Sequence, residues 1–182
     1  MTTIDDILIF LMDYSKLTAG NKAPEVVLAI IEIPENSGVK YEVDKHNGLV
    51  MADRFMHGSN VFPFNYGFIP GTYAQDGDAL DVIVVSSSSM APGTGINVRP
   101  VGMLEMEDEE GPDAKIIAVP VEKVDPFFAH IKEVADIDEP TRLKIKHFFD
   151  TYKILEKGKW VKTGRYLPKA KAIAEIKKTI IK

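Results

Sequence analysis

Residues 26–33 (VVLAIIEI) form an almost entirely apolar run that any stable fold of this chain has to bury. The run is too short for a typical helix and does not alternate with polar residues, so it predicts a strand covered on both faces. Further strands are expected at 39–44, 49–55, 82–85, 96–105 and 115–121. Asn47-Gly48 separates the first two of these and is a strong signal for a hairpin turn.

Helical spacing is found near both ends of the chain. Residues 3–17 place apolar side chains on one face, and Thr3 is a suitable N-cap. Residues 139–155 do the same after a capping Asp138, and Pro168 is expected to open a final helix. Strands followed by helices indicate the α+β class, and short strands of similar length favour a small closed barrel over an open sheet.

Composition narrows the class of function. The chain has 22 basic and 27 acidic residues and a formal net charge of -5, which argues against a non-specific nucleic-acid binder or a protein of anionic membranes. It has no cysteine, which excludes disulfides and thiolate metal sites. The longest early apolar run, 7–12, is too short for a signal peptide or a membrane span, so a cytoplasmic location is expected.

Three carboxylates lie close together in the stretch DGDALD, which starts at Asp76. In an extended chain Asp76 and Asp78 point to the same side, and Gly77 allows a turn through which Asp81 joins them. Such groups would repel each other and raise their own pKa values unless a hard cation such as Mg²⁺ bound them. A solvated acidic turn is the alternative for so short a motif. An EF-hand loop is excluded, because Leu80 and Asp81 stand where that loop needs an oxygen ligand and a glycine.

A second acidic stretch, 105–115 (EMEDEEGPDAK), carries its acids before and after a Gly-Pro pair. Most of them are expected to be solvated at a hairpin tip, which is also the alternative for the whole stretch. Asp108 and Asp113 are the candidate metal ligands. Two carboxylate clusters that the fold brings together would hold two or more metals, as is typical of enzymes that direct in-line attack on phosphorus.

Candidate groups for binding an anion are scattered along the sequence. Lys40 and Glu42 alternate along one predicted strand and therefore face the same way. The other candidates are Arg54, Tyr66, Tyr152 and Lys153. Each alone is explained equally well as a surface cation or a core tyrosine, and Tyr152 lies on the apolar side of its helix.

Taken together, these segments resemble the family I soluble inorganic pyrophosphatases of the prokaryotic type. The matching segments within 24–160 are IEIP at 31–34, KYEVDK at 40–45, DRFM at 53–56, PFNYGFIPGT at 63–72, DGDALDV at 76–82, RPVGML at 99–104, DEEGPDAKIIAVP at 108–120 and HFFDTYKILEKGKW at 147–160. The resemblance implies a small five-stranded OB-like β-barrel with flanking α-helices. It also implies Mg²⁺-dependent hydrolysis of pyrophosphate to two phosphates by a metal-activated water.

The resemblance further implies a role for individual residues. Asp78 would be the general base. The metal ligands would be Asp76, Asp81, Asp108, Asp113 and Glu42. The substrate would be held by Lys40, Arg54, Tyr66, Tyr152 and Lys153, with Glu32, Glu109 and Lys115 as supporting groups. Phe62 stands where the family commonly has tyrosine, which removes one hydroxyl near the site.

The expected organisation is a single domain over 1–182, with an N-terminal helical extension at 1–20, a catalytic core at 24–160 and a C-terminal tail helix at 161–182. Relatives of this type imply a homohexamer that acts on a small molecule, with neither nucleic acid nor a membrane as a partner.

Three other functions fit parts of the sequence. A barrel that binds nucleic acid would need a basic groove with aromatic side chains, whereas the distinctive residues here are carboxylates. A calcium buffer is disfavoured by the spacing of the first acidic cluster. A hydrolase of nucleotides or polyphosphate is disfavoured by the absence of a G-x-x-x-x-G-K-[ST] phosphate loop.

Overall fold

A computed structural model describes residues 14–44, 47–74 and 77–181. Its strands are β1 (Val27–Ile33), β2 (Val39–Val43), β3 (Val50–Phe55), β4 (Asn65–Ile69), β5 (Leu80–Val84), β6 (Gly95–Asp108), β7 (Gly111–Pro112), β8 (Lys115–Pro120) and β9 (Val161–Pro168). Its helices are α1 (Glu139–Thr151) and α2 (Lys169–Thr179), with short 3-10 turns at Tyr14–Lys16, Pro126–Phe128 and Val134–Asp136. None of the helices in these ranges is long and apolar enough to cross a bilayer.

Five strands close into a ring in the order β1-β4-β5-β8-β6, and β6 pairs back to β1. The pairing of β5 with β8 is parallel, and the other four pairings of the ring are antiparallel. The ring confirms the α+β class and the expected OB-like barrel. It forms because its strands carry continuous apolar runs that need cover on both faces.

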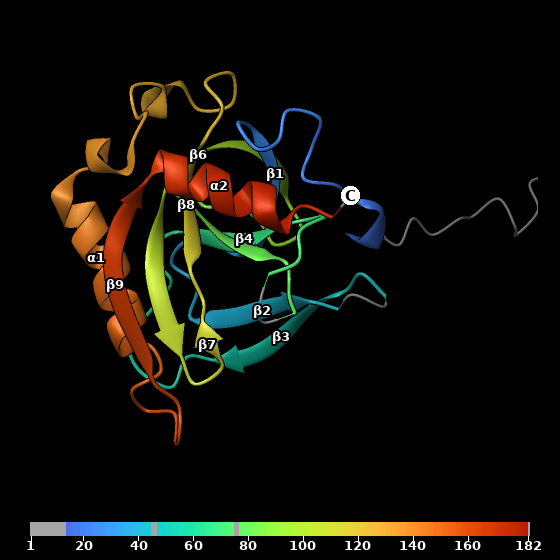
Figure 1. Ribbon diagram of the computed structural model, residues 1–182. Helices are drawn as coiled ribbons and strands as arrows, with labels where there is room; N and C mark the ends of the chain where they lie inside the picture. The colour runs from blue at the N-terminus through green and yellow to red at the C-terminus, as the bar shows by residue number, and fades with distance from the viewer. Residues whose placement is uncertain (1–13, 45–46, 75–76, 182) are drawn as a thin grey trace, which may run out of the picture.

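Alternate residues of the ring strands enter two separate hydrophobic clusters. Ile83 and Ile117 pack with Phe148 of α1, whereas Val82 and Ile116 pack with Ile176 of α2. Helix α1 lies along β9, and α2 crosses β6 (Figure 1). The two helices therefore cover alternate side chains of the same strands. Among the described residues, neither helix covers the end of the ring near β7.

The β2–β3 hairpin forms a two-stranded sheet of its own, and among the described residues it has no ladder with the ring. Its turn contains Asn47 and Gly48 as predicted, with Gly48 at a φ of 72° and its N–H donated to the carbonyl of Asp44. In Figure 1 the hairpin lies near β7, below the ring. This separate sheet provides one wall of the cleft that holds most of the predicted site residues.

Several predicted boundaries are wrong. Strand β4 was not predicted, because Asn65 and Gly67 interrupt the apolar pattern of a strand whose residues are nearly all buried. The predicted tail helix at 161–182 is wrong in its first part, since 161–168 pair with β6 as strand β9. The α2 helix does begin directly after Pro168.

The helices predicted at 139–155 and at 3–17 have different outcomes. The helix predicted at 139–155 ends earlier, at Thr151, and Asp138 caps it by accepting a 2.9 Å hydrogen bond from the backbone N–H of Thr141. Most of the helix predicted at 3–17 lies outside the described residues, and its described end, Tyr14–Lys16, is a 3-10 turn.

Candidate active site

A cleft of about 720 Å³ lies between the β2–β3 hairpin, strands β4 and β5, the segment at β7 and the end of α1. The fold brings twelve of the predicted site residues to its wall: Glu32, Lys40, Glu42, Arg54, Tyr66, Asp78, Asp81, Asp108, Asp113, Lys115, Tyr152 and Lys153. Glu109 does not line the cleft but contacts Lys153, which does. Asp76 lies outside the described residues.

Lys115 is the central cation of the cleft and is almost fully buried. Its ammonium donates hydrogen bonds to the carboxylates of both Asp81 and Asp113. Burial alone would lower the pKa of Lys115, but the two carboxylates outweigh that effect and raise it. Burial raises the pKa of Asp113 to about 6, against the attraction of Lys115 and with the repulsion of Asp81. One ammonium therefore binds two carboxylates, so Lys115, Asp81 and Asp113 together keep a net negative charge.

The carboxylate oxygens of Asp81 and Asp113 are suitable ligands for Mg²⁺. Within 14–44, 47–74 and 77–181, no three acidic or histidine side chains converge closely enough to hold a metal by themselves. Mg²⁺ usually takes only a few protein carboxylates and completes its shell with waters and substrate phosphates. Asp81 and Asp113 supply two such oxygens at a place where negative charge is in excess, and Asp108 lies on the same wall.

Glu32 of β1 lies behind this group. Burial raises its pKa, with smaller contributions from the nearby Asp81 and Glu42, and the net result is a pKa of about 7. The backbone N–H of Val43 donates a 2.8 Å hydrogen bond to its carboxylate, which acts in the opposite direction. Glu32 is therefore partly protonated near neutral pH in the metal-free protein.

Two cations of the hairpin, Lys40 and Arg54, also line the cleft. Lys40 pairs with Glu42 on the same strand, so the predicted common orientation is confirmed. Asp53 accepts from Lys40 at 3.3 Å and from Nη1 of Arg54 at 3.1 Å. The sequence analysis gave Asp53 no role, although it directly precedes Arg54. Its function as a shared partner is visible only when the two strands are paired.

Two tyrosines line the cleft, Tyr66 buried and Tyr152 partly buried. The ammonium of Lys115 lies 5.8 Å from the ring centre of Tyr66, and that of Lys153 lies 5.7 Å from the ring centre of Tyr152. Burial raises the pKa of both phenols, so both stay protonated near neutral pH. Phe62 is 2% exposed and packs 4.6 Å from Phe148, within the same aromatic cluster.

The end of α1 is tied to the acidic tip beside β7. Lys153 donates to Asp108 at 2.8 Å and to Glu109 at 3.3 Å. Lys159, which the sequence analysis missed, pairs with Glu109 at 2.6 Å. Burial would raise the pKa of Glu109, but the hydrogen bonds from Lys159 and the Trp160 N–H lower it to about 2. Glu109 is therefore an ionised anchor for the two lysines.

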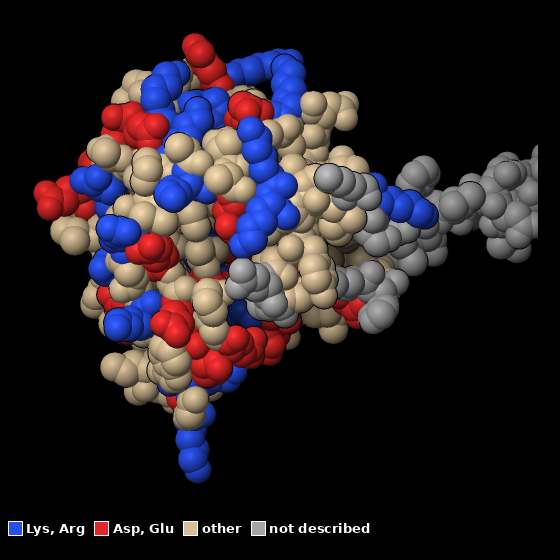
Figure 2. Space-filling view, in the orientation of Figure 1, with Lys and Arg blue, Asp and Glu red and all other residues tan. Residues whose placement is uncertain are grey.

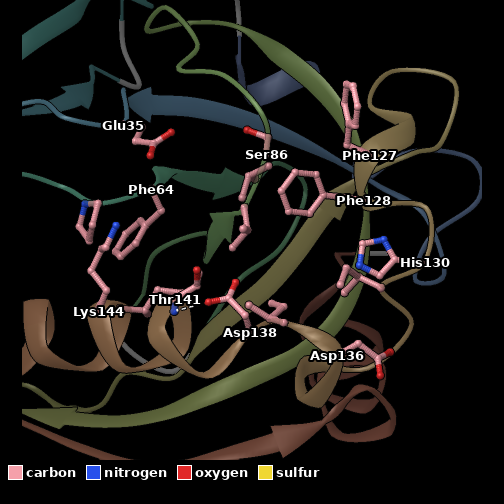
Figure 3. Close-up of a pocket in the computed structure, with 16 residues that line it drawn as sticks. Glu35, Phe64, Ser86, Phe127, Phe128, His130, Asp136, Asp138, Thr141 and Lys144 are labelled. Carbon is pink, nitrogen blue, oxygen red and sulfur yellow. Dashed lines mark hydrogen bonds between the residues drawn. The ribbon is translucent and has the colours of Figure 1, made fainter.

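A second hollow of about 360 Å³ is lined by Phe64, Phe128 and residues of α1 (Figure 3). Two of its carboxylates already cap backbone N–H groups: Asp138 accepts from Thr141, and Asp136 accepts from Lys132 and Glu133. None of the predicted site residues that the structure describes lines it. On the face that carries α2, basic and acidic side chains are intermingled rather than gathered by sign (Figure 2). The larger cleft is accordingly the candidate active site.

This chain is similar to proteins of known family over most of its length. The family model described as "Inorganic pyrophosphatase" matches residues 29–182. The inorganic pyrophosphatase of Aeropyrum pernix is 53% identical over 165 residues, covering 91% of this chain and 94% of that protein. That of Aquifex pyrophilus is 52% identical over 169 residues, covering 93% and 96%. The crystal structure of inorganic pyrophosphatase from Thermus thermophilus aligns with a TM-score of 0.89 at 45% identity, covering 92% of this chain and 97% of the other. This chain therefore belongs to the inorganic pyrophosphatase family.

Proposed function

We propose that this protein hydrolyses inorganic pyrophosphate to two phosphates. The observation that carries the proposal is that carboxylates and cations line one and the same cleft. Asp81 and Asp113 lie on its wall together with Lys40, Arg54 and Lys153. Carboxylates alone would repel a pyrophosphate anion, so this arrangement suits a substrate that enters together with divalent cations.

We propose Mg²⁺ as the cofactor. The residues that would hold it are Asp76, Asp81, Asp108, Asp113 and Glu42, with Glu32, Glu109 and Lys115 in support. Bound Mg²⁺ would lower the pKa of a coordinated water and offset the charge of the phosphates. The hard oxygen donors support this choice over a metal that prefers nitrogen or sulfur ligands.

Side chains of the protein would accept the proton of the water and bind the phosphoryl groups. Asp78 is exposed at the rim of the cleft, where it would accept the proton of the attacking water. Lys40, Arg54 and Lys153 would bind the phosphoryl oxygens and stabilise charge on the leaving phosphate. The phenols of Tyr66 and Tyr152 stay protonated, so each can donate a hydrogen bond to the anion.

We also propose a cytoplasmic homohexamer, as the family resemblance implies. Apolar side chains that are exposed in the single chain, including Phe55 at 72%, Ile154 at 76% and Leu155 at 63%, are suited to contacts between subunits. Sedimentation of the purified protein tests the assembly, and a species with the mass of one chain would contradict it. Cell fractionation tests the location.

The activity is tested by measuring phosphate release from pyrophosphate with Mg²⁺ and with excess EDTA, with ATP as a control substrate. Rapid release that requires Mg²⁺ and is confined to pyrophosphate is expected. Release from ATP at a similar rate would favour a nucleotide hydrolase. No release with any divalent metal would refute the proposed enzyme.

A further inference from the structure

Arg54 is held from two sides in the cleft. Its Nη1 donates to Asp53 at 3.1 Å, and its Nε lies 3.2 Å from the carboxylate of Glu156. The Nε atom is shielded from solvent and makes no hydrogen bond of good geometry within the described part of the chain. The charge of Arg54 is therefore compensated by Asp53 and Glu156 together, with Glu156 at the shielded Nε. Without Glu156 this shielded N–H would lose its charged partner, which carries a desolvation cost.

Glu156 belongs to the turn that follows α1. Its side chain is only 10% exposed. Its backbone N–H donates to the carbonyl of Lys153 at 2.8 Å, and its own carbonyl accepts from Lys159 at 3.2 Å. The same short turn thus carries Tyr152 and Lys153 on the cleft wall and Glu156 behind Arg54.

This contact joins two parts of the fold that share no strand pairing. Arg54 belongs to the separate β2–β3 sheet, whereas Glu156 follows α1, which packs on the ring. Arg54 and Lys153 both line the cleft, so their separation decides how well they bind the two ends of one anion. An ion pair between the two parts fixes that separation.

We infer that Glu156 is a positioning residue, which fixes Arg54 for binding the phosphoryl group of the substrate. With Nε facing Glu156 and Nη1 bound to Asp53, the remaining Nη2 is left for phosphate oxygens. The inference rests on the proposed function, because it assumes that Arg54 binds a phosphate-containing anion.

The test is a double-mutant cycle in which Glu156→Gln is made alone and together with Arg54→Ala. The amide of glutamine keeps the size of the side chain and removes its charge. We expect Glu156→Gln to raise KM for pyrophosphate on the order of tenfold and to change kcat by much less. In the Arg54→Ala background the same substitution should change KM by less than about twofold, because its target is absent.

Glu122→Gln is the matched control, since Glu122 is exposed in the loop after β8 and outside the cleft. It should leave KM unchanged. Thermal melting of each variant shows whether it is folded. If Glu156→Gln does not fold, Glu156→Asp replaces it, and the shorter carboxylate should raise KM in the single variant only.

Calorimetric binding of imidodiphosphate, in the presence of Mg²⁺, separates this inference from the proposed function. Hydrolysis by the unmodified protein tests the function, and the cycle in binding affinity tests the role of Glu156. An unchanged affinity in Glu156→Gln would overturn the inference, as would an equal loss in the Arg54→Ala background. An unmodified protein that binds no imidodiphosphate would overturn it as well.

Discussion

Lys115 on β8 donates a hydrogen bond to Asp81 on β5, although 34 positions separate them in the sequence. The two meet because β5 and β8 pair in parallel, with Val82 opposite Ile116, so the residues just before these two lie side by side. The same ammonium also serves Asp113. The parallel pairing of the ring therefore places a buried cation between two carboxylates that would otherwise repel each other.

Replacing Lys115 by methionine should destabilise the metal-free protein by about 3 kcal/mol, because two largely buried carboxylates lose their common partner. Mg²⁺ should recover much of this loss, since it binds the folded carboxylates and not the unfolded chain. Urea denaturation in EDTA and in Mg²⁺ measures both effects.

The exposed Lys144→Met serves as a control and should change little in either condition. If Lys115→Met lost as much stability in Mg²⁺ as in EDTA, the Lys115 ammonium and Mg²⁺ would not bind the same carboxylates.

Asp78 and Asp81 should differ when each is changed to asparagine. Asp78 is exposed at the rim, whereas Asp81 is held by Lys115 at the base of the cleft. Asp78→Asn should lower kcat by about a hundredfold or more, the usual effect of losing a general base, while Mg²⁺ affinity stays near normal. Asp81→Asn should weaken both. Steady-state kinetics and calorimetric metal titration distinguish the two, and identical behaviour would refute the division of roles.

Glu32 should make the metal-free protein less stable as the pH rises. Its pKa is raised from 4.5 to about 7 on folding, so the folded state holds its proton more tightly than the unfolded state. Stability is then greatest below the unfolded pKa, falls through the window up to the folded pKa and is level above it. Glu32→Gln should reduce the loss between about pH 5 and about pH 8 by roughly 2 kcal/mol.

Urea denaturation in EDTA at the two pH values measures this difference. A variant whose stability depends on pH as steeply as that of the unmodified protein would show that other groups, such as Asp113, account for the whole effect.

Gly67 should tolerate no side chain. A Cβ there would lie 1.8 Å from the carbonyl oxygen of Ile30 on the neighbouring β1. Gly67→Ala should therefore destabilise the protein by about 3 kcal/mol or more. Gly95→Ala is a matched change in β6, where the new methyl would meet only side chains at 3.5 Å or more, and it should cost less than about 1 kcal/mol. Thermal melting of both variants in EDTA measures the contrast, and equal losses would contradict it.

The fold could be predicted where local signals and tertiary structure agree. The apolar run of β1, the Asn47-Gly48 turn and the Asp138 cap are local features with local causes. Strand β4 was missed because Gly67 interrupts its apolar pattern. That glycine is required by the closeness of β1, and the residues next to it in the sequence give no sign of this contact. Strand β9 was missed because an edge strand with one exposed face carries mostly polar residues.

The residues of the candidate site could likewise be predicted only in part. The acids of the 76–81 and 105–115 stretches are recognisable because they are clustered, and most of the predicted residues do line one cleft. Asp53, Glu156 and Lys159 carry no such signal, since each matters through a charged residue on a different element. Supporting partners of this kind follow from the packing of elements, which a single sequence does not display.

The close approach at Gly67 also bears on how sequences of this fold are interpreted. Gly67 lies beside Tyr66, within a segment that would be taken as a signature of the active site. Its identity is nevertheless dictated by the distance between two backbones, which is needed whether or not the cleft performs any reaction. A descendant that had lost its activity would still have to keep this glycine. Retention of Gly67 would therefore be a record of barrel closure, and the fate of the acids at Asp78 and Asp81 would be the better record of catalysis.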